Sequence, residues 1–220
     1  MLSAYVFDAY GTLFDVHAAI GRHRAAAGPD ADRFSEIWRT KQLEYGWTLT
    51  LAGHYVDFSK LTERALDFAF ARFPSVDRGL RGKLLEAYLT LDAFPDVRTA
   101  LTELKSRGAR LAILSNGTPA MLAAAIEAAA MRGLLDGVFS VDAVRRYKPR
   151  PEVYALVTEA LGIEPSDTGF VSSNRWDVMG AVSFGFKAFW VNRTSAPNEY
   201  PDQAPEQVIP GLAALLDAAS

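Results

Sequence analysis

The 220-residue chain contains no cysteine, no long basic run and no apolar segment long enough to span a bilayer. The missing cysteines exclude disulfides, thiolate metal sites and cysteine nucleophiles together. A net charge of −3 disfavours nucleic acid and anionic membrane surfaces as partners. The first residues lack the basic segment of a secretion signal, so we expect a cytoplasmic protein.

Half of the residues are hydrophobic and 22% are charged, which is typical of a globular protein. The glycines and serines form neither a dinucleotide-binding fingerprint nor a P-loop, which argues against nucleotide binding. His17, His23 and His54 lack the spacing of metal ligands. The chemistry must therefore come from other side chains.

One stretch near the amino terminus, residues 4–15, combines a predicted strand with a carboxylate and a tight turn. Residues 5–7 form an apolar run of β-formers, which predicts a short strand buried on both faces. Asp8 ends this run, and Gly11 and Thr12 follow in a turn. Ligands bind at the carboxyl ends of strands in an open parallel sheet, so Asp8 is placed to do chemistry. From these residues alone, it could equally start a turn or cap a helix.

The rest of the chain divides into a helical part and an alternating part. Residues 16–92 carry apolar side chains at helical spacing, with expected helices at 18–27, 35–45, 58–73 and 81–91. After residue 96, the expected strands are 110–114, 138–141, 168–171 and 187–191. The expected helices there begin near residue 97 and at 119–132, 151–161, 177–184 and 211–219.

This alternation predicts an α/β fold with a doubly wound parallel sheet, a Rossmann-like core formed by residues 1–15 and 93–220. Residues 16–92 are then an inserted helical cap subdomain, called the cap below. Ligand-binding loops of such a core lie at one edge of the sheet. We therefore expect the polar residues that follow different strands to converge there.

Three of the predicted strands end in polar clusters. These are the segments 8–12 (Asp-Ala-Tyr-Gly-Thr), 115–116 (Ser-Asn) and 172–177 (Ser-Ser-Asn-Arg-Trp-Asp), and Lys148 lies in a fourth loop. Their order and spacing resemble the haloacid dehalogenase superfamily over almost the whole chain, cap included. The resemblance implies that Asp8 is a nucleophile.

The residue two positions after Asp8 bears on the branch of that superfamily. Its phosphatases have a second aspartate there, because a departing alkoxide needs a proton. Here the position holds Tyr10, and only Asp177 is acidic in the fourth motif, which leaves few ligands for magnesium. Halide is a stable anion that leaves without a proton. Lys148 can instead keep Asp8 ionised, and we expect no metal and no cofactor.

These departures make the chain similar to the L-2-haloacid dehalogenase branch. The segments VFDAYGTLFD, SNG and SSNRWD resemble its core motifs, and residues 38–45 resemble the cap helix that carries its arginine. The resemblance implies that Asp8 displaces halide from C2 of a short L-2-haloalkanoic acid with inversion. Water then hydrolyses the aspartyl ester and releases a D-2-hydroxy acid.

The resemblance also implies roles for the other site residues. Thr12 and Ser172 orient Asp8, Lys148 keeps it charged, and Asn174 and Asp177 position or activate the hydrolytic water. Substrate and halide are held by the polar residues Ser115, Arg39 and Asn116, by Tyr154, and by a wall formed by Tyr10, Leu43, Phe58 and Trp176. The partner is a small-molecule 2-haloacid, and the family leaves a homodimer open.

Two other functions remain open at this stage. One is a magnesium-dependent phosphatase that uses Asp8, and the other is a catalytically silent binding module. The phosphatase needs an acid at position 10, and a silent module would be expected to have lost several of the motif residues. Away from the resemblance, a helical arginine such as Arg39 is usually a surface residue, and Trp176, Phe58 and Tyr154 are usual core aromatics.

Overall fold

The computed structural model describes residue 2 and residues 4–218, and its centre is a six-stranded parallel sheet in the order β3-β2-β1-β4-β5-β6. The strands are β1 (Ala4–Phe7), β2 (Arg110–Ser115), β3 (Gly137–Ser140), β4 (Thr168–Ser172), β5 (Lys187–Val191) and β6 (Gln207–Ile209). The α/β fold and its doubly wound parallel sheet are thus confirmed.

Helices cover both faces of the sheet and also form the cap. They are α1 (Ala18–Gly21), α2 (Arg24–Ala27), α3 (Ala31–Leu51), α4 (Phe58–Arg72), α5 (Arg81–Leu89), α6 (Val97–Ser106), α7 (Pro119–Ala128), α8 (Pro151–Leu161), α9 (Arg175–Phe184) and α10 (Leu215–Ala218). Short 3₁₀ helices are η1 (Gly28–Asp30), η2 (Arg78–Leu80), η3 (Arg132–Leu134), η4 (Val141–Ala143), η5 (Pro165–Asp167) and η6 (Leu212–Ala214). Among the described residues, no helix has the length and apolarity to cross a membrane.

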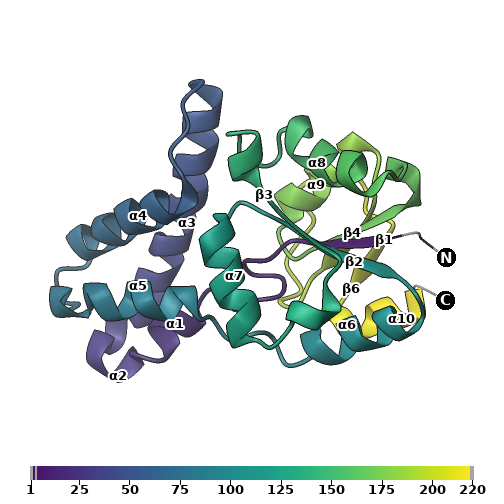
Figure 1. Cartoon of the computed structure of the whole chain (residues 1–220). Coiled ribbons are helices and arrows are strands. Elements are labelled where there is room, and N and C mark those ends of the chain that lie inside the picture. The colour runs from purple at the N-terminus through teal and green to yellow at the C-terminus, as the bar shows by residue number, and fades with distance from the viewer. Residues whose placement is uncertain (1, 3, 219–220) are drawn as a thin grey trace.

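Strand β1 lies at the point where the strand order reverses. It pairs with β2 on one side and with β4 on the other, so that Ala4 lies opposite both Arg110 and Thr168. All four of its residues are buried, which explains the unbroken apolar run. In Figure 1, α8 and α9 lie together on one side of the sheet, and α6 and α10 lie on the other. The carboxyl ends of β1, β2 and β4 share one edge.

The cap lies beside that edge and consists of α1 to α5 (Figure 1). Its centre is the pair α3 and α4, in which Phe34 packs edge-on against Phe70 with ring centroids 5.0 Å apart. The Trp38 indole donates to the Thr62 carbonyl at 2.9 Å. The helical content of residues 16–92 agrees with the expectation, and the boundaries of the two subdomains stay a prediction.

Several expected elements differ in extent. The helix expected at 18–27 is two short helices, because the backbone of His23 departs from helical geometry with φ of −117° and ψ of 15°. Beside this break, the Arg22 guanidinium binds Asp92 at 2.7 Å. The helix expected at 119–132 ends at Ala128, since Ala130 adopts a left-handed conformation with φ of 51°. The terminal helix expected at 211–219 is η6 followed by α10, and residue 219 lies outside the described residues.

Strand β6 was not among the expected strands. Its three residues have prolines close to both ends and follow a stretch without periodicity, so the sequence carries no strand signal there. It pairs only with β5, at the edge of the sheet. The strand does not contribute to the candidate site.

The close approach of β1 and β4 leads to a stability prediction. A Cβ added at Gly169 would lie 2.8 Å from the ring of Tyr5, its partner across the β1–β4 ladder. We expect Gly169→Ala to lower the free energy of unfolding by about 1–3 kcal/mol through overpacking. Urea unfolding measures this. Gly133→Ala is the control, since nothing lies within 4 Å of its Cβ position, and equal loss in both variants would contradict the prediction.

Candidate active site

Asp8 is held at the carboxyl end of β1 in a buried position. Its backbone N–H donates to the Val171 carbonyl at 2.9 Å, which continues the β1–β4 ladder, and the residue is 5% exposed. Oδ2 of Asp8 accepts hydrogen bonds from Asn174 Nδ2 at 2.7 Å, Thr12 Oγ1 at 3.0 Å and Ser172 Oγ at 3.5 Å. These donors favour the ionised carboxylate and fix its orientation.

Lys148 lies between two buried carboxylates. Its Nζ donates to Asp8 Oδ1 at 3.2 Å and to Asp177 Oδ2 at 2.8 Å, and the side chain is fully buried. The ammonium also lies 5.0 Å from the centroid of the Phe170 ring. A buried charge needs a partner, so the ammonium and the two carboxylates stabilise one another. The contact of Lys148 with Asp8 agrees with the role expected from the sequence.

The carboxyl group of Asp177 has a raised pKa. Burial raises its pKa to about 6, and the negative charge of Asp8 also raises it, whereas Lys148 and a hydrogen bond from Tyr154 lower it. The Tyr154 hydroxyl donates to Asp177 Oδ1 at 2.7 Å, and burial raises the pKa of Tyr154 well above 10, which keeps it a donor. Tyr154 is itself fully buried behind Asp177. Its placement therefore favours holding Asp177 rather than the substrate contact expected from the sequence.

The donor set around Asp8 does not suit a hard dication. Within residue 2 and residues 4–218, no group of three or more histidine, cysteine, aspartate or glutamate side chains could hold a metal ion. Between Asp8 and Asp177, where a cation would be shared, the Lys148 ammonium already supplies the positive charge. Magnesium prefers several oxygen ligands in octahedral geometry, and these residues do not fit it.

Arg39 reaches the core from the cap. It lies on α3, and its NH2 group donates to the backbone carbonyl of Tyr10 at 3.0 Å. A cavity of about 490 Å³ adjoins the Asp8 cluster, and Arg39, Asn174 and Trp176 are among the residues that line it. A fixed guanidinium at the wall of a cavity beside the carboxylate is suited to bind an anion.

Aromatic rings close the site on the cap side. The Tyr10 ring stacks on Tyr88 at 5.6 Å and packs against Phe58 at 5.9 Å, and Trp176 packs edge-on against Trp47 at 5.2 Å. Tyr10 and Phe58 thus belong to one group of rings and Trp176 to another, and the expected single wall stays a prediction. Leu43 on α3 is half-buried, and its place in the wall stays a prediction.

The loop after β2 is tied together by its own polar groups. Ser115 Oγ accepts from the Gly117 backbone N–H at 3.1 Å, and Asn116 Oδ1 accepts from the Lys148 backbone N–H at 3.2 Å. The structure therefore places Ser115 as a turn-forming residue and Asn116 as a support for Lys148. Their expected contacts with substrate and halide stay predictions.

Two site residues were not singled out from the sequence. Ser173 fixes Thr12, since its backbone N–H donates to Thr12 Oγ1 at 2.9 Å and its Oγ donates to the Gly11 carbonyl at 2.6 Å. Gly117 lies under the ring of Tyr10, and a Cβ there would be 2.6 Å from Tyr10 Cε2. Position 117 therefore requires glycine, because the ring of Tyr10 occupies the space that a Cβ would need.

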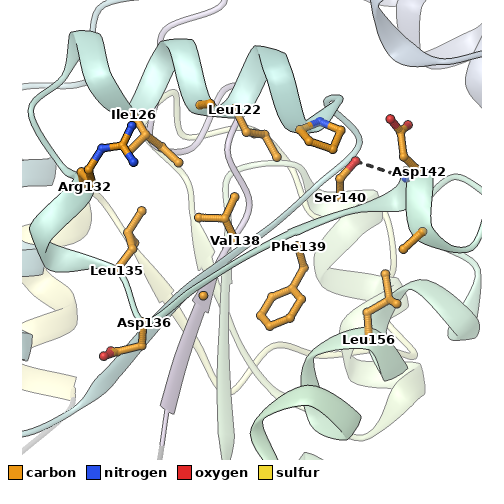
Figure 2. Close-up of a pocket in the computed structure, with 14 residues that line it drawn as sticks. Leu122, Ile126, Arg132, Leu135, Asp136, Val138, Phe139, Ser140, Asp142 and Leu156 are labelled. Atoms are coloured by element: carbon orange, nitrogen blue, oxygen red, sulfur yellow. Dashed lines mark hydrogen bonds between the residues drawn. The ribbon is translucent and has the colours of Figure 1, made fainter.

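Another cavity, of about 780 Å³, lies away from this cluster (Figure 2). It runs along β3 and is lined mainly by apolar side chains, among them Leu122, Ile126 and Phe139. None of the sequence-predicted site residues lines it. The size of a cavity therefore does not identify the candidate site, because the polar groups that converge around Asp8 lie elsewhere.

Comparison with known proteins agrees with this geometry. The model of the haloacid dehalogenase-like hydrolase family matches residues 2–185. (S)-2-haloacid dehalogenase 4A of Burkholderia cepacia is 46% identical over 200 residues, which cover 90% of this chain and 87% of that protein.

Solved structures extend the similarity to the whole fold. A dehalogenase with an intermediate complex is 42% identical with a TM-score of 0.96, covering 99% of this chain and 96% of that one. The L-2-haloacid dehalogenase from Xanthobacter autotrophicus with chloropropionic acid covalently bound is 37% identical with a TM-score of 0.88, covering 100% and 98%. The resemblance inferred from the motifs is thereby confirmed, and the chain belongs to the haloacid dehalogenase-like hydrolase family, in its (S)-2-haloacid dehalogenase branch.

Proposed function

We propose that the chain hydrolyses short L-2-haloalkanoic acids to D-2-hydroxyalkanoic acids through an ester on Asp8, without a metal. The carrying observation is a buried Asp8 carboxylate fixed by three side-chain donors and the Lys148 ammonium, with Tyr10 where a phosphatase needs its acid. A chloropropionic acid covalently bound in the Xanthobacter autotrophicus relative supports a covalent route.

In the first step, one oxygen of Asp8 attacks C2 of the substrate from the side opposite the carbon–halogen bond. The C–O bond forms as the C–halogen bond breaks, so C2 is inverted and halide departs with the bonding electron pair. Covalent catalysis replaces one difficult displacement by two easier steps. Holding the carboxylate in line with the bond contributes up to about 7–11 kcal/mol in well-oriented models.

Arg39 is the residue we assign to the departing halide. Its guanidinium lines the cavity beside Asn174 and is anchored to the Tyr10 carbonyl. Negative charge develops on the halogen as the bond breaks, and a fixed cation there stabilises the transition state more than the neutral halogen of the ground state. The aromatic wall excludes water and strengthens these interactions.

In the second step, water attacks the ester carbonyl carbon of Asp8, and the bond from that carbon to the ester oxygen breaks. The proton that water gives up passes through Asp177 to the departing alkoxide, and the regenerated carboxyl group of Asp8 ionises and releases the proton of the overall reaction. Asp177 is placed to accept the proton, since its pKa of about 6 leaves it ionised at neutral pH. Lys148 balances the negative charge as Asp8 is regenerated, because its Nζ contacts both carboxylates. Overall, haloacid and water give hydroxy acid, halide and one proton.

The setting of this reaction is part of the same proposal. We expect the protein to act in the cytoplasm on a free 2-haloacid, with no nucleic acid partner and no cofactor. The family leaves a homodimer open, and analytical ultracentrifugation measures the oligomeric state.

The first test is halide release from L- and D-2-chloropropionate, each with EDTA and with magnesium. We expect release from the L form alone, unaffected by EDTA and abolished in Asp8→Asn. Asp202→Asn, a change at an exposed aspartate, is the matched control and should keep wild-type activity. Mass spectrometry of the Asp8 peptide under single turnover detects the ester.

Other outcomes of this test select the alternatives. Magnesium-dependent turnover of phosphate esters that EDTA abolishes would establish the phosphatase. Binding of L-2-chloropropionate without release of halide or phosphate would establish a silent binding module.

The pH dependence tests the role of Asp177. Activity should fall with decreasing pH as Asp177 takes up a proton near its pKa of about 6. Tyr154→Phe removes a hydrogen bond that favours the ionised form, so the acidic limb of kcat should move to higher pH by about one unit. Tyr5→Phe is the control, because the buried Tyr5 hydroxyl has no hydrogen-bond partner among the described residues. An unmoved limb in Tyr154→Phe would remove Asp177 from the role of base.

A further inference from the structure

Tyr147, the residue before Lys148, belongs to the core chain but is packed into the cap. It is 1% exposed, and its ring stacks on Tyr55 at 5.5 Å and packs against Phe58 of α4 at 6.1 Å. The loop that carries the catalytic lysine is thus anchored outside its own subdomain.

Hydrogen bonds anchor the same residue at two further points. The Tyr147 hydroxyl donates to the Val56 carbonyl at 2.7 Å, and its backbone N–H donates to Thr50 Oγ1 of α3 at 3.1 Å. Both the side chain and the backbone of Tyr147 are therefore held by the cap. The next residue, Lys148, is held by the core through Asp8, Asp177 and Asn116.

Gly46 shows how closely α3 approaches this ring. It lies within α3, and a Cβ there would be 3.2 Å from Tyr147 Cγ. A glycine inside a helix destabilises it by about 0.5–1 kcal/mol relative to alanine. The contact with Tyr147 gives a physical reason for a glycine at this position.

A second cap–core contact holds the start of the same loop. The Tyr55 hydroxyl donates a short hydrogen bond to Asp142 of η4, and the Arg145 guanidinium lies 5.4 Å from the centroid of the Tyr55 ring. Figure 2 shows Asp142 at the end of the groove along β3, beside Ser140, which accepts from its backbone N–H. The segment from Asp142 to Tyr147 is thus docked on the cap at both ends.

Open space remains between the cap and the core next to Tyr147. A cavity of about 410 Å³ is lined there by Trp47, Thr50, Tyr147, Lys148 and Trp176, among others. Because open space adjoins the lysine loop, the contacts of Tyr147 with α3 and α4 restrain that loop on this side.

We propose that Tyr147 is a positioning residue. Through its contacts with the cap, the position of the Lys148 ammonium between Asp8 and Asp177 depends on the position of the cap relative to the core. This coupling rests on the proposed function, since it assigns Tyr147 a role in the reaction at Asp8. When α3 contacts Tyr147, the ammonium lies within hydrogen-bond distance of both carboxylates. The site is therefore complete only when the cap is packed against the core. Displacement of α3 carries Lys148 away from the two carboxylates.

Gly46→Ala is the main test, because the added methyl group pushes Tyr147 away from α3. We expect kcat for L-2-chloropropionate to fall about 2- to 10-fold, because the ring must move by a few tenths of an ångström and a displacement of about 1 Å can cost about 100-fold. Gly82→Ala is the matched control: it is also a helical glycine of the cap, and nothing lies within 4 Å of its Cβ position. Both variants gain helix propensity, and urea unfolding of each measures any stability that Gly46→Ala loses through its contact with Tyr147.

The pH profile separates positioning from a merely structural effect. The groups that face Asp177 are Lys148, Asp8 and Tyr154, and the positive charge of Lys148 lowers the pKa of Asp177. A displaced ammonium therefore moves the acidic limb of kcat to higher pH in Gly46→Ala and not in Gly82→Ala. Carbon-13 NMR titration of the Asp177 carboxyl reports the same shift without turnover.

Thr50 provides an independent variant. Thr50→Val removes the acceptor for the Tyr147 N–H, and we expect faster hydrogen exchange at that amide together with the same upward shift of the acidic limb. Thr50→Ser restores the hydroxyl and should restore both. Thr48→Val is the control on the same helix, since Thr48 Oγ1 bonds only to carbonyls of its own helix, Glu44 and Tyr45, in the described part of the chain.

The outcomes distinguish this proposal from the proposed function. Wild-type activity and an unmoved acidic limb in both Gly46→Ala and Thr50→Val would overturn the coupling, and so would lost activity with an unmoved limb. If the wild type releases no halide, the proposed function fails, and an unmoved Asp177 titration in Gly46→Ala then overturns the coupling as well.

Discussion

The site depends on one buried ammonium shared by two carboxylates. Lys148 Nζ lies 3.2 Å from Asp8 and 2.8 Å from Asp177, and the lysine side chain is fully buried. Breaking a buried ion pair by removing one partner typically costs about 3–5 kcal/mol, because the remaining charge is uncompensated. The ammonium therefore compensates both carboxylates, which would otherwise repel each other. Its contact gives Asp8 a defined direction and opposes the rise of the Asp177 pKa that burial and the charge of Asp8 cause.

The fold brings this unit together from distant parts of the chain. Asp8 follows β1, Asp177 lies in the first turn of α9 after β4, and Lys148 lies in the loop before α8. The pairing of β1 with β4 places the first two side by side, and the loop before α8 supplies the cation. The cap adds Arg39, Phe58 and Tyr88, so the complete site belongs to neither subdomain alone.

Most of the core and the polar residues at its strand ends were predictable from the sequence. The strands β1, β2, β4 and β5 are apolar runs bounded by turn residues, and their periodicity suffices to place them. β6 is three residues long, and Arg22, at the break between α1 and α2, contacts Asp92, which lies 70 positions away. Such features are set by tertiary contacts that local patterns do not record.

For the candidate site as well, the sequence predicts residue types in motifs but not contacts between distant segments. Residue type and order indicated Asp8, Lys148 and Asp177, because their chemistry is visible in the motifs. The place of Tyr154 behind Asp177 and the dependence of Thr12 on Ser173 were not visible, since both are contacts between segments distant in sequence. A tyrosine between apolar residues is predicted as a core residue whether or not its hydroxyl donates to a buried carboxylate.

The packing of Tyr10 over Gly117 bears on how easily one hydrolase of this family could be turned into another. An aspartate at position 10 would supply the acid of a phosphatase, but it would also leave unfilled the space between Tyr88, Phe58 and Gly117 that the ring occupies. The new carboxylate would stand among aromatic side chains, close to a second negative charge on Asp8. A change of leaving group thus requires the cap-side packing to change along with the acid, and a single substitution at this position does not convert the chemistry.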